Sequence, residues 1–309
     1  MIIGPADIEA AASRIEGRVR VTPVMTLEEG AWGLSGRLVL KLECLQHTGS
    51  FKPRGAFNRI LSSSAPPAGV IAASGGNHGA AVAYAARSLG RHAEIFVPES
   101  TPPLKVERLR RYGARVSLIG ASYPEALTAS MARAAETGAL VVHAYDQPEV
   151  AAGQGTVARE LEHQTPDLDT LLVAVGGGGL IAGIAAWFQG RVHVVGVEPE
   201  GAPTLARAME AGRPVDVPVT GVAVDSLGAH RAGALAFAIA QRYVDRVVLV
   251  TDDAILAAQR TLWEDVRVAA EPGGATALAA LLSGQYRPAP EERVGVLVCG
   301  ANLDPRRLN

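Results

Sequence analysis

Short runs of β-branched and apolar residues alternate with longer segments of helical periodicity, and this alternation restricts the fold more than any other feature of the chain. The expected strands cover residues 38–43, 70–72, 94–97, 116–119, 140–142, 171–175, 193–197, 246–250 and 294–298. Such strand–helix alternation is typical of parallel sheets, and strands that are apolar on both faces indicate helices on each side. The sequence predicts an α/β fold with two doubly wound, mostly parallel sheets.

Composition argues against several classes of protein. With 48% hydrophobic and 19% charged residues, the chain resembles globular proteins and not disordered ones. Its 29 basic and 31 acidic residues give a net charge of −2, so no positive excess is available for nucleic acid or an anionic membrane. Two cysteines, Cys44 and Cys299, form no CxxC pattern, which argues against disulfides and zinc and favours a cytoplasmic protein.

One apolar stretch, residues 170–188, is about as long as a membrane span. Four consecutive glycines run through it, and glycine strongly disfavours a continuous helix. We therefore expect a strand, a glycine loop and a helix there, and no membrane partner.

Two linker-like segments, residues 62–69 and 143–148, suggest a division of the chain. Residues 1–59 and 148–309 would together form a large cofactor-binding domain. Residues 60–147 would form a small domain inserted between them.

Lys52 lies between Phe51 and Pro53, just after an expected strand and just before a helix. A lysine amine becomes a Schiff-base nucleophile when burial or neighbouring charge lowers its pKa, and a loop between two domains could provide both. Taken alone, the motif also fits a solvent-exposed loop lysine.

The segment Ser74, Gly75, Gly76, Asn77 and His78 follows a strand and opens a helix. Backbone N–H groups at a helix start can bind an anion, so this loop is a candidate carboxylate site. The alternative is a tight turn with an asparagine cap.

Gly176, Gly177, Gly178, Gly179 and Leu180 also join a strand to a helix. This arrangement can surround a phosphate with backbone donors, although neither the Walker motif nor a full GxGxxG is present. A glycine hinge without a ligand is the alternative.

Cys299 ends the last expected strand, where a small thiol could meet a ring nitrogen. A cysteine that only packs in the core is the alternative. The histidines show no metal-ligand spacing, so we expect no metal site.

In this order, the four segments resemble the fold type II family of pyridoxal-phosphate enzymes, the tryptophan synthase β-like group. Within it, the chain is most similar to the serine/threonine dehydratases and serine racemases, over nearly its whole length. The resemblance implies a pyridoxal 5'-phosphate cofactor, a small amino acid substrate and a homodimer.

The resemblance also implies roles for individual residues. Lys52 would form the Schiff base with the cofactor, Phe51 would pack beside it, and Asn77 would donate a hydrogen bond to its phenolic oxygen. The loop from Gly176 to Leu180 would hold the phosphate. Cys299 would face the pyridine nitrogen.

The remaining loop, Ser74 to His78, would bind the substrate carboxylate. A neutral thiol at Cys299 does not hold a proton on the ring, which favours expulsion of a β-substituent over reprotonation of the substrate. The expected reaction is therefore β-elimination from L-threonine or L-serine, giving 2-oxobutanoate or pyruvate plus ammonia.

Several alternatives stay open. Within the family, they are a serine racemase, a β-replacement enzyme, or a dehydratase of another β-hydroxy amino acid such as hydroxyaspartate or phenylserine. From a different class, a non-catalytic protein could use the glycine loop to bind a phosphate metabolite. That protein would have no need of a buried amine at Lys52.

The chain departs from the family pattern at three places. Gly75 stands where racemases have a serine that acts as the second acid/base, which disfavours racemisation. Glu198 and Ala202 match a metal site, but Thr204 replaces its aspartate, which makes a divalent metal doubtful. Ser226 stands where many dehydratases have glycine close to the cofactor, so the preferred substrate is the least certain expectation.

Overall fold

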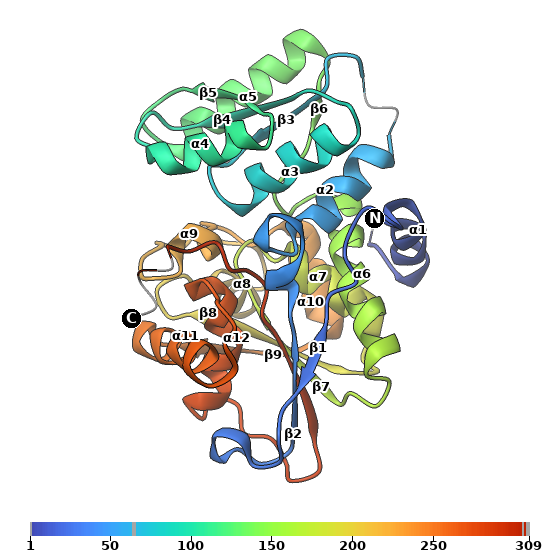
Figure 1. Cartoon of the computed structure of the whole chain (residues 1–309), viewed down its shortest axis with the longest axis vertical. Helices are drawn as coiled ribbons and strands as arrows, with labels where there is room; N and C mark the ends of the chain where they lie inside the picture. Colours follow the sequence, from blue (N-terminus) through green and yellow to red (C-terminus); the bar gives the residue numbers. More distant parts are fainter. Residues whose placement is uncertain (1, 64–65, 305, 307–309) are drawn as a thin grey trace.

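Two mostly parallel sheets, each covered by helices, stand one above the other in the computed structural model of the chain (Figure 1). The structure describes residues 2–63, 66–304 and 306. Residues 64 and 65, which belong to the expected linker 62–69, lie outside this described part.

The larger sheet has the strand order β1-β2-β10-β7-β8-β9. Its neighbours pair in parallel except for β1 and β2, which are antiparallel. The strands are β1 (Val24–Thr26), β2 (Arg37–Lys41), β7 (Thr170–Ala174), β8 (His193–Pro199), β9 (Val244–Val250) and β10 (Arg293–Leu297). The central strand β7 is buried along its whole length, as a parallel strand between two helical layers should be.

The smaller sheet has the order β5-β4-β3-β6 and is parallel throughout. Its strands are β3 (Val70–Ala73), β4 (Ala93–Val97), β5 (Arg115–Leu118) and β6 (Leu140–Val141). The α3 helix and the α5 helix pack on its strands, and two separate apolar clusters form its core.

Helices link the strands and cover both sheets. They are α1 (Pro5–Ile15), α2 (Lys52–Leu61), α3 (Asn77–Ser88), α4 (Pro103–Arg111), α5 (Tyr123–Thr137), α6 (Pro148–Gln164), α7 (Gly179–Phe188), α8 (Thr204–Ala211), α9 (Val224–Leu227), α10 (Ala234–Tyr243), α11 (Asp252–Val266) and α12 (Pro272–Leu282). Single 3-10 turns are η1 (Ala31–Gly33), η2 (Glu43–Leu45) and η3 (His47–Gly49). The α12 helix packs on β7, β8, β9 and β10, while α6 packs against α7 and α2.

The two doubly wound, mostly parallel sheets expected from the sequence are confirmed. Every expected strand is present with ends shifted by at most a few residues, and only β1 was not expected. The apolar stretch 170–188 forms strand β7, a glycine loop and helix α7, as predicted. Within the described residues, no helix is both long and apolar enough to cross a bilayer.

A buried ion network joins α2 to the larger sheet. The Arg54 guanidinium, 1% exposed, donates to both carboxylate oxygens of Glu43 at 2.9 and 2.7 Å and to Glu160 at 2.9 Å. Glu160 also accepts from Lys41 Nζ at 2.5 Å. Burial alone would lower the pKa of Arg54, but the charges and hydrogen bonds of Glu43 and Glu160 raise it. The network, two cations and two anions, therefore fixes the first turn of α2.

We predict that Arg54→Ala lowers the free energy of unfolding by about 3–5 kcal/mol, because it leaves the buried Glu43 carboxylate without its cation and Glu160 with Lys41 alone. Arg59→Ala, on the same helix, removes the solvent-accessible pair with Glu149 and should cost less than about 1 kcal/mol. Urea unfolding of both variants measures the difference. An equal loss of unfolding free energy in the two variants would show that the network around Arg54 is no stronger than the pair between Arg59 and Glu149.

Candidate active site

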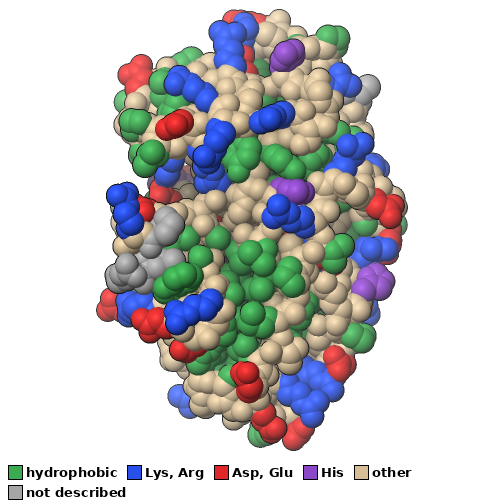
Figure 2. Space-filling view, in the orientation of Figure 1, with side chains coloured by type: hydrophobic (Ala, Val, Ile, Leu, Met, Phe, Trp, Pro, Cys, Tyr) green, Lys and Arg blue, Asp and Glu red, His purple; other side chains and the backbone are tan. Residues whose placement is uncertain are grey.

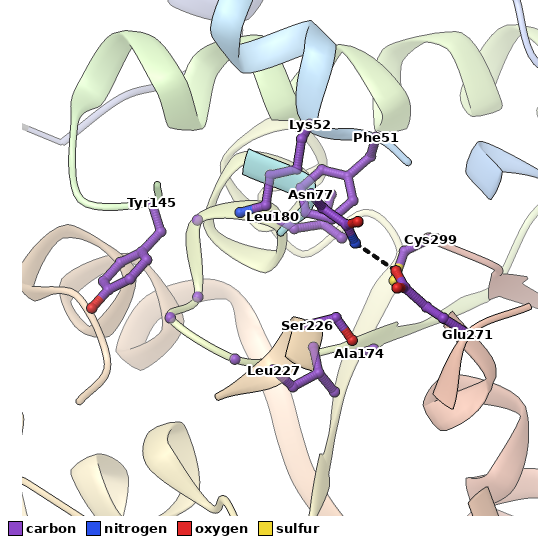
Figure 3. Close-up of a pocket in the computed structure, with 14 residues that line it drawn as sticks. Phe51, Lys52, Asn77, Tyr145, Ala174, Leu180, Ser226, Leu227, Glu271 and Cys299 are labelled. Atoms are coloured by element: carbon purple, nitrogen blue, oxygen red, sulfur yellow. Dashed lines mark hydrogen bonds between the residues drawn. The ribbon is translucent and has the colours of Figure 1, made fainter. Parts of the chain in front are cut away.

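A pocket of about 470 Å³ opens where the starts of four helices meet, between the two sheets (Figures 1 and 3). Its lining includes Lys52 at the start of α2, Asn77 at the start of α3, and Glu271, which directly precedes α12. The loop before α7 completes it, together with Phe51, Tyr145, Ala174, Ser226, Leu227 and Cys299. Because helix starts carry unpaired N–H groups, they make such a pocket attractive to anions.

Lys52 directs its amine into this pocket (Figure 3). Its Nζ donates to the Ala144 carbonyl at 2.9 Å and lies 5.0 Å from the centre of the Phe51 ring. Removal from solvent lowers the pKa of Lys52 to about 8, against smaller opposing effects of Cys299 and Glu271. The amine is therefore partly neutral near physiological pH, which a nucleophile or general base requires.

Asn77 lies across the pocket from the glycine loop and is hydrogen-bonded to an acid. Its Nδ2 donates to Glu271 Oε1 at 2.5 Å (Figure 3). Glu271 is 5% exposed, and burial raises its pKa to about 7 even though the bond from Asn77 acts in the opposite direction. The pocket thus contains a carboxyl group that the sequence motifs did not predict.

The glycine loop leads from β7 into α7, and its residues have no room for side chains. Gly178 has φ +88°, a conformation that disfavours any residue with a Cβ. A Cβ at Gly177 or Gly179 would collide with Tyr145. The backbone therefore passes close to Tyr145, and the start of α7 faces the pocket without side chains to block it.

Behind the loop, Thr204 and Glu198 support it from α8 and β8. Thr204 Oγ1 lies 2.6 Å from the Gly176 carbonyl and 2.8 Å from Glu198 Oε1. Glu198 also accepts from the backbone N–H groups of Leu205 and Ala206 at 2.8 and 2.9 Å. Burial nevertheless raises the pKa of Glu198 to about 7. This acid, which the resemblance linked to a metal site, is engaged in hydrogen bonds to α8.

Cys299 closes the pocket at the end of β10. Its thiol is 5% exposed and lies 3.5 Å from the Gly273 carbonyl, to which it donates. Burial raises the pKa of the Cys299 thiol, so the group stays neutral across the physiological range.

The structure brings all the predicted cofactor residues together in one pocket. Of the predicted substrate loop, only Asn77 belongs to the lining of this pocket. Phe51, Lys52, Asn77, the loop from Gly176 to Leu180, and Cys299 all line one pocket. Ser74, Gly75, Gly76 and His78 lie in the adjoining turn and first helical residues, outside the lining. The buried His78 ring contacts the Val142 carbonyl through Nε2 at 2.8 Å, and burial lowers its pKa to about 3.

Sequence reasoning missed Glu271 and Tyr145, as well as the apolar lining residues Ala174 and Leu227. Glu271 precedes Pro272 and two glycines at the start of a helix, a pattern that ordinarily indicates capping. Its side chain makes no capping bond and turns into the pocket instead. The only sequence signal available was the unusual Glu-Pro-Gly-Gly itself; Tyr145 had none.

We predict that the free amine of Lys52 titrates near pH 8, well below the ordinary lysine value of 10.5. Below the midpoint the amine is protonated and unreactive, and above it the amine is neutral and attacks an amine-specific reagent. Because the chain has three lysines, mass spectrometry of the labelled peptides can follow Lys52 alone. Lys52→Arg controls for the peptide assignment, and a midpoint above pH 10 would contradict the prediction.

The chain was also compared with known proteins. A family model described as "Pyridoxal-phosphate dependent enzyme" matches residues 15–300. An L-threonine ammonia-lyase from Geobacter sulfurreducens is 40% identical over 307 residues, which cover 98% of this chain and 76% of that protein.

Two solved structures agree with this assignment. The structure of maize serine racemase has a TM-score of 0.93 and 35% identity, covering 100% of this chain and 96% of its own. A threonine deaminase from T.th. has a TM-score of 0.90 and 38% identity, covering 98% of this chain and 99% of its own. The chain therefore belongs to the family of pyridoxal-phosphate dependent enzymes.

Proposed function

We propose that the protein is a pyridoxal-phosphate dependent ammonia-lyase that converts L-threonine or L-serine to 2-oxobutanoate or pyruvate and ammonia. The observation that carries the proposal is Lys52, an amine of lowered pKa directed into a pocket with a glycine loop and a neutral thiol. Relatives named threonine ammonia-lyase and threonine deaminase, each covered over two thirds of its length or more, support this choice of reaction.

The residues present fit pyridoxal 5'-phosphate. The loop from Gly176 to Leu180, which has no side chains up to Gly179 and leads into α7, offers backbone donors to a phosphate. Lys52 would hold the aldehyde carbon, Phe51 would pack beside the ring, and Asn77 would donate to the phenolic oxygen.

When bound, the cofactor supplies an electron sink for negative charge at the substrate Cα. Lys52, once the substrate amine has displaced it from the aldehyde carbon, would be the base that takes the Cα proton, because its amine lies in the pocket with a lowered pKa. The resulting ammonium can return that proton to the departing β-hydroxyl. Ser74 to His78 offer backbone N–H groups for the substrate carboxylate.

Cys299 favours elimination in this proposal. Its thiol keeps its proton, so it offers neither a positive nor a negative charge to a ring nitrogen. Without a protonated ring, charge stays closer to Cα and expels the β-substituent.

A serine racemase is the second candidate, because maize serine racemase has a very similar structure. Racemisation needs a proton carrier on each side of the substrate, and Gly75 brings none. Ser226 lies against Gly273 at the pocket edge, so its hydroxyl can influence which β-hydroxy amino acid is preferred, hydroxyaspartate and phenylserine included. The family assignment argues against a non-catalytic phosphate-binding protein.

We keep the expected domains as a proposal: residues 60–147 as the small domain, and 1–59 with 148–309 as the large one. All strands of the smaller sheet fall inside 60–147 and all strands of the larger sheet outside it. The first boundary falls near the end of α2, which packs against both α3 and α6. The pocket then lies where the two domains meet.

A cytoplasmic setting is proposed as well, supported by two buried cysteines that form no disulfide. The redox state of the thiols in freshly lysed cells tests the cytoplasmic setting.

Metal independence also stays a prediction. Among the described residues, no group of three or more histidine, cysteine or acidic side chains is placed to bind a metal. Activity in the presence of a chelator tests metal independence.

We predict that the purified protein with its cofactor absorbs visible light and releases 2-oxo acid from L-threonine or L-serine, and that Lys52→Ala loses both properties. The reason is that Lys52 both holds the cofactor and moves the Cα proton. An absorbance spectrum and a 2-oxo acid assay in one cuvette measure both, and a D-serine assay on the same samples tests racemisation.

Each outcome has a distinct meaning. An absorbing protein that forms D-serine faster than pyruvate would favour the racemase, and one inactive on both substrates would favour another β-hydroxy amino acid. No absorbance after reconstitution with the cofactor would overturn the proposed function. Lys105→Ala, which removes the exposed lysine paired with Asp225, controls for general effects of losing a lysine.

We also predict a homodimer, with a mass in solution of twice 32.0 kDa by light scattering. Hydrophobic side chains gather on one face of the larger sheet's half of the molecule (Figure 2). Val21 and Leu45 are 76% and 49% exposed, on segments that Arg20 ties together through the Leu45 carbonyl. Large exposed apolar areas of this kind mark interaction sites. A monomer at micromolar concentration would contradict the prediction.

A further inference from the structure

The Asn77 carboxamide lies in a row of hydrogen bonds that crosses the back of the pocket. Asn302 Nδ2 donates to the Thr48 carbonyl at 2.8 Å and to Asn77 Oδ1 at 2.6 Å. Asn77 Nδ2 donates in turn to Glu271 Oε1 at 2.5 Å (Figure 3). The row links four segments that are far apart in the sequence.

The direction of this row is fixed at its Thr48 end. A backbone carbonyl can only accept, so Thr48 requires the amino group of Asn302, whose two N–H donors are then both used. Asn77 must therefore offer its carbonyl oxygen to Asn302 and its amino group to Glu271. The ionised form of Glu271 can only accept, and it therefore fits the same orientation.

Packing leaves little freedom for the two partners of Asn77. Glu271 is 5% exposed, and its carboxylate lies so close to the backbone of Gly300 that a Cβ there would collide with it. The Thr48 carbonyl also accepts from Arg108 Nη2 at 2.9 Å, which further fixes the start of the row. Both partners are thus held by groups outside the pocket.

An amide so oriented has one N–H left for the pocket. Asn77 uses one hydrogen of Nδ2 for Glu271, and the second stays available on the side that lines the pocket. A flipped amide would present an oxygen lone pair at the same place. An anionic oxygen in the pocket would gain a hydrogen bond from the first arrangement and be repelled by the second.

We propose that Asn302 and Glu271 are positioning residues that act through Asn77, fixing its amide so that it presents a hydrogen-bond donor to the cofactor. This inference rests on the proposed function, because the contact between Asn77 and the phenolic oxygen is itself proposed. It adds two residues to the cofactor site that do not touch the cofactor.

The test reverses the two hydrogen bonds that Asn77 makes. Asn302→Asp replaces the donor with an acceptor, so Asn77 turns its amino group toward residue 302, and the Thr48 carbonyl keeps only its bond from Arg108. Adding Glu271→Gln supplies a donor for the turned Asn77 carbonyl and so restores both bonds of Asn77 in the opposite direction. We measure the cofactor dissociation constant, the absorbance maximum of the reconstituted enzyme, and the thermal unfolding midpoint without cofactor.

We expect Asn302→Asp to weaken cofactor binding about tenfold or more, as the loss of a charge-assisted hydrogen bond should. In the double variant the unfolding midpoint should recover toward the wild type, while cofactor binding stays weak and the absorbance maximum stays shifted. If binding recovers together with stability, or if Asn302→Asp binds within twofold of the wild type, the positioning role is wrong.

Three further variants complete the design. Asn302→Leu is uncharged and similar in size, removes both donors, and gives the same expected tenfold loss if the aspartate variant does not fold. Asn58→Asp changes a buried asparagine that bonds the Glu149 carbonyl, away from the pocket, and controls for the substitution itself. Asn77→Ala tests the proposed contact: tight binding there would overturn the proposed role of Asn77, and weak binding there with unaffected Asn302 variants would overturn only the present inference.

Discussion

The buried pairing of Arg54 with Glu43 and Glu160 holds the rest of the site in place. Lys52 stands two residues before Arg54, so the ion network that fixes the first turn of α2 also fixes the lysine amine. Burying charges is costly, and the cost is offset here only because every ion has a close partner of opposite sign. Burial lowers the pKa of the reactive amine, whereas the carboxylates of Glu43 and Glu160 raise the pKa of Arg54 in spite of burial.

Close packing also explains the glycine loop better than ligand binding alone. Gly177 and Gly179 lie against Tyr145, and Gly176 is bonded through its carbonyl to Thr204. These contacts are made by the polypeptide itself, before any phosphate arrives. The loop is therefore preorganised, so less conformational entropy is lost when a ligand binds.

Both sheets could be predicted from the sequence because a covered parallel strand leaves a continuous apolar run. The strand β1 (Val24–Thr26) left no such run, since it is short and half-exposed. Lys52 and Asn77 were recognisable because each begins a helix after a strand, where ligand sites are common. Glu271 and Tyr145 were not, because only tertiary packing decides that a residue beside a helix start turns into a pocket.

Four helix starts converge on the pocket, and their backbone dipoles add a positive contribution to its potential beside that of the charged side chains. Because the whole chain has a net charge of −2, this positive contribution is confined to the pocket and is not a property of the whole molecule. Anionic groups of a ligand are favoured next to the unpaired N–H groups of these helix starts. The backbone therefore contributes to the orientation of an anionic ligand before any side chain of the pocket does.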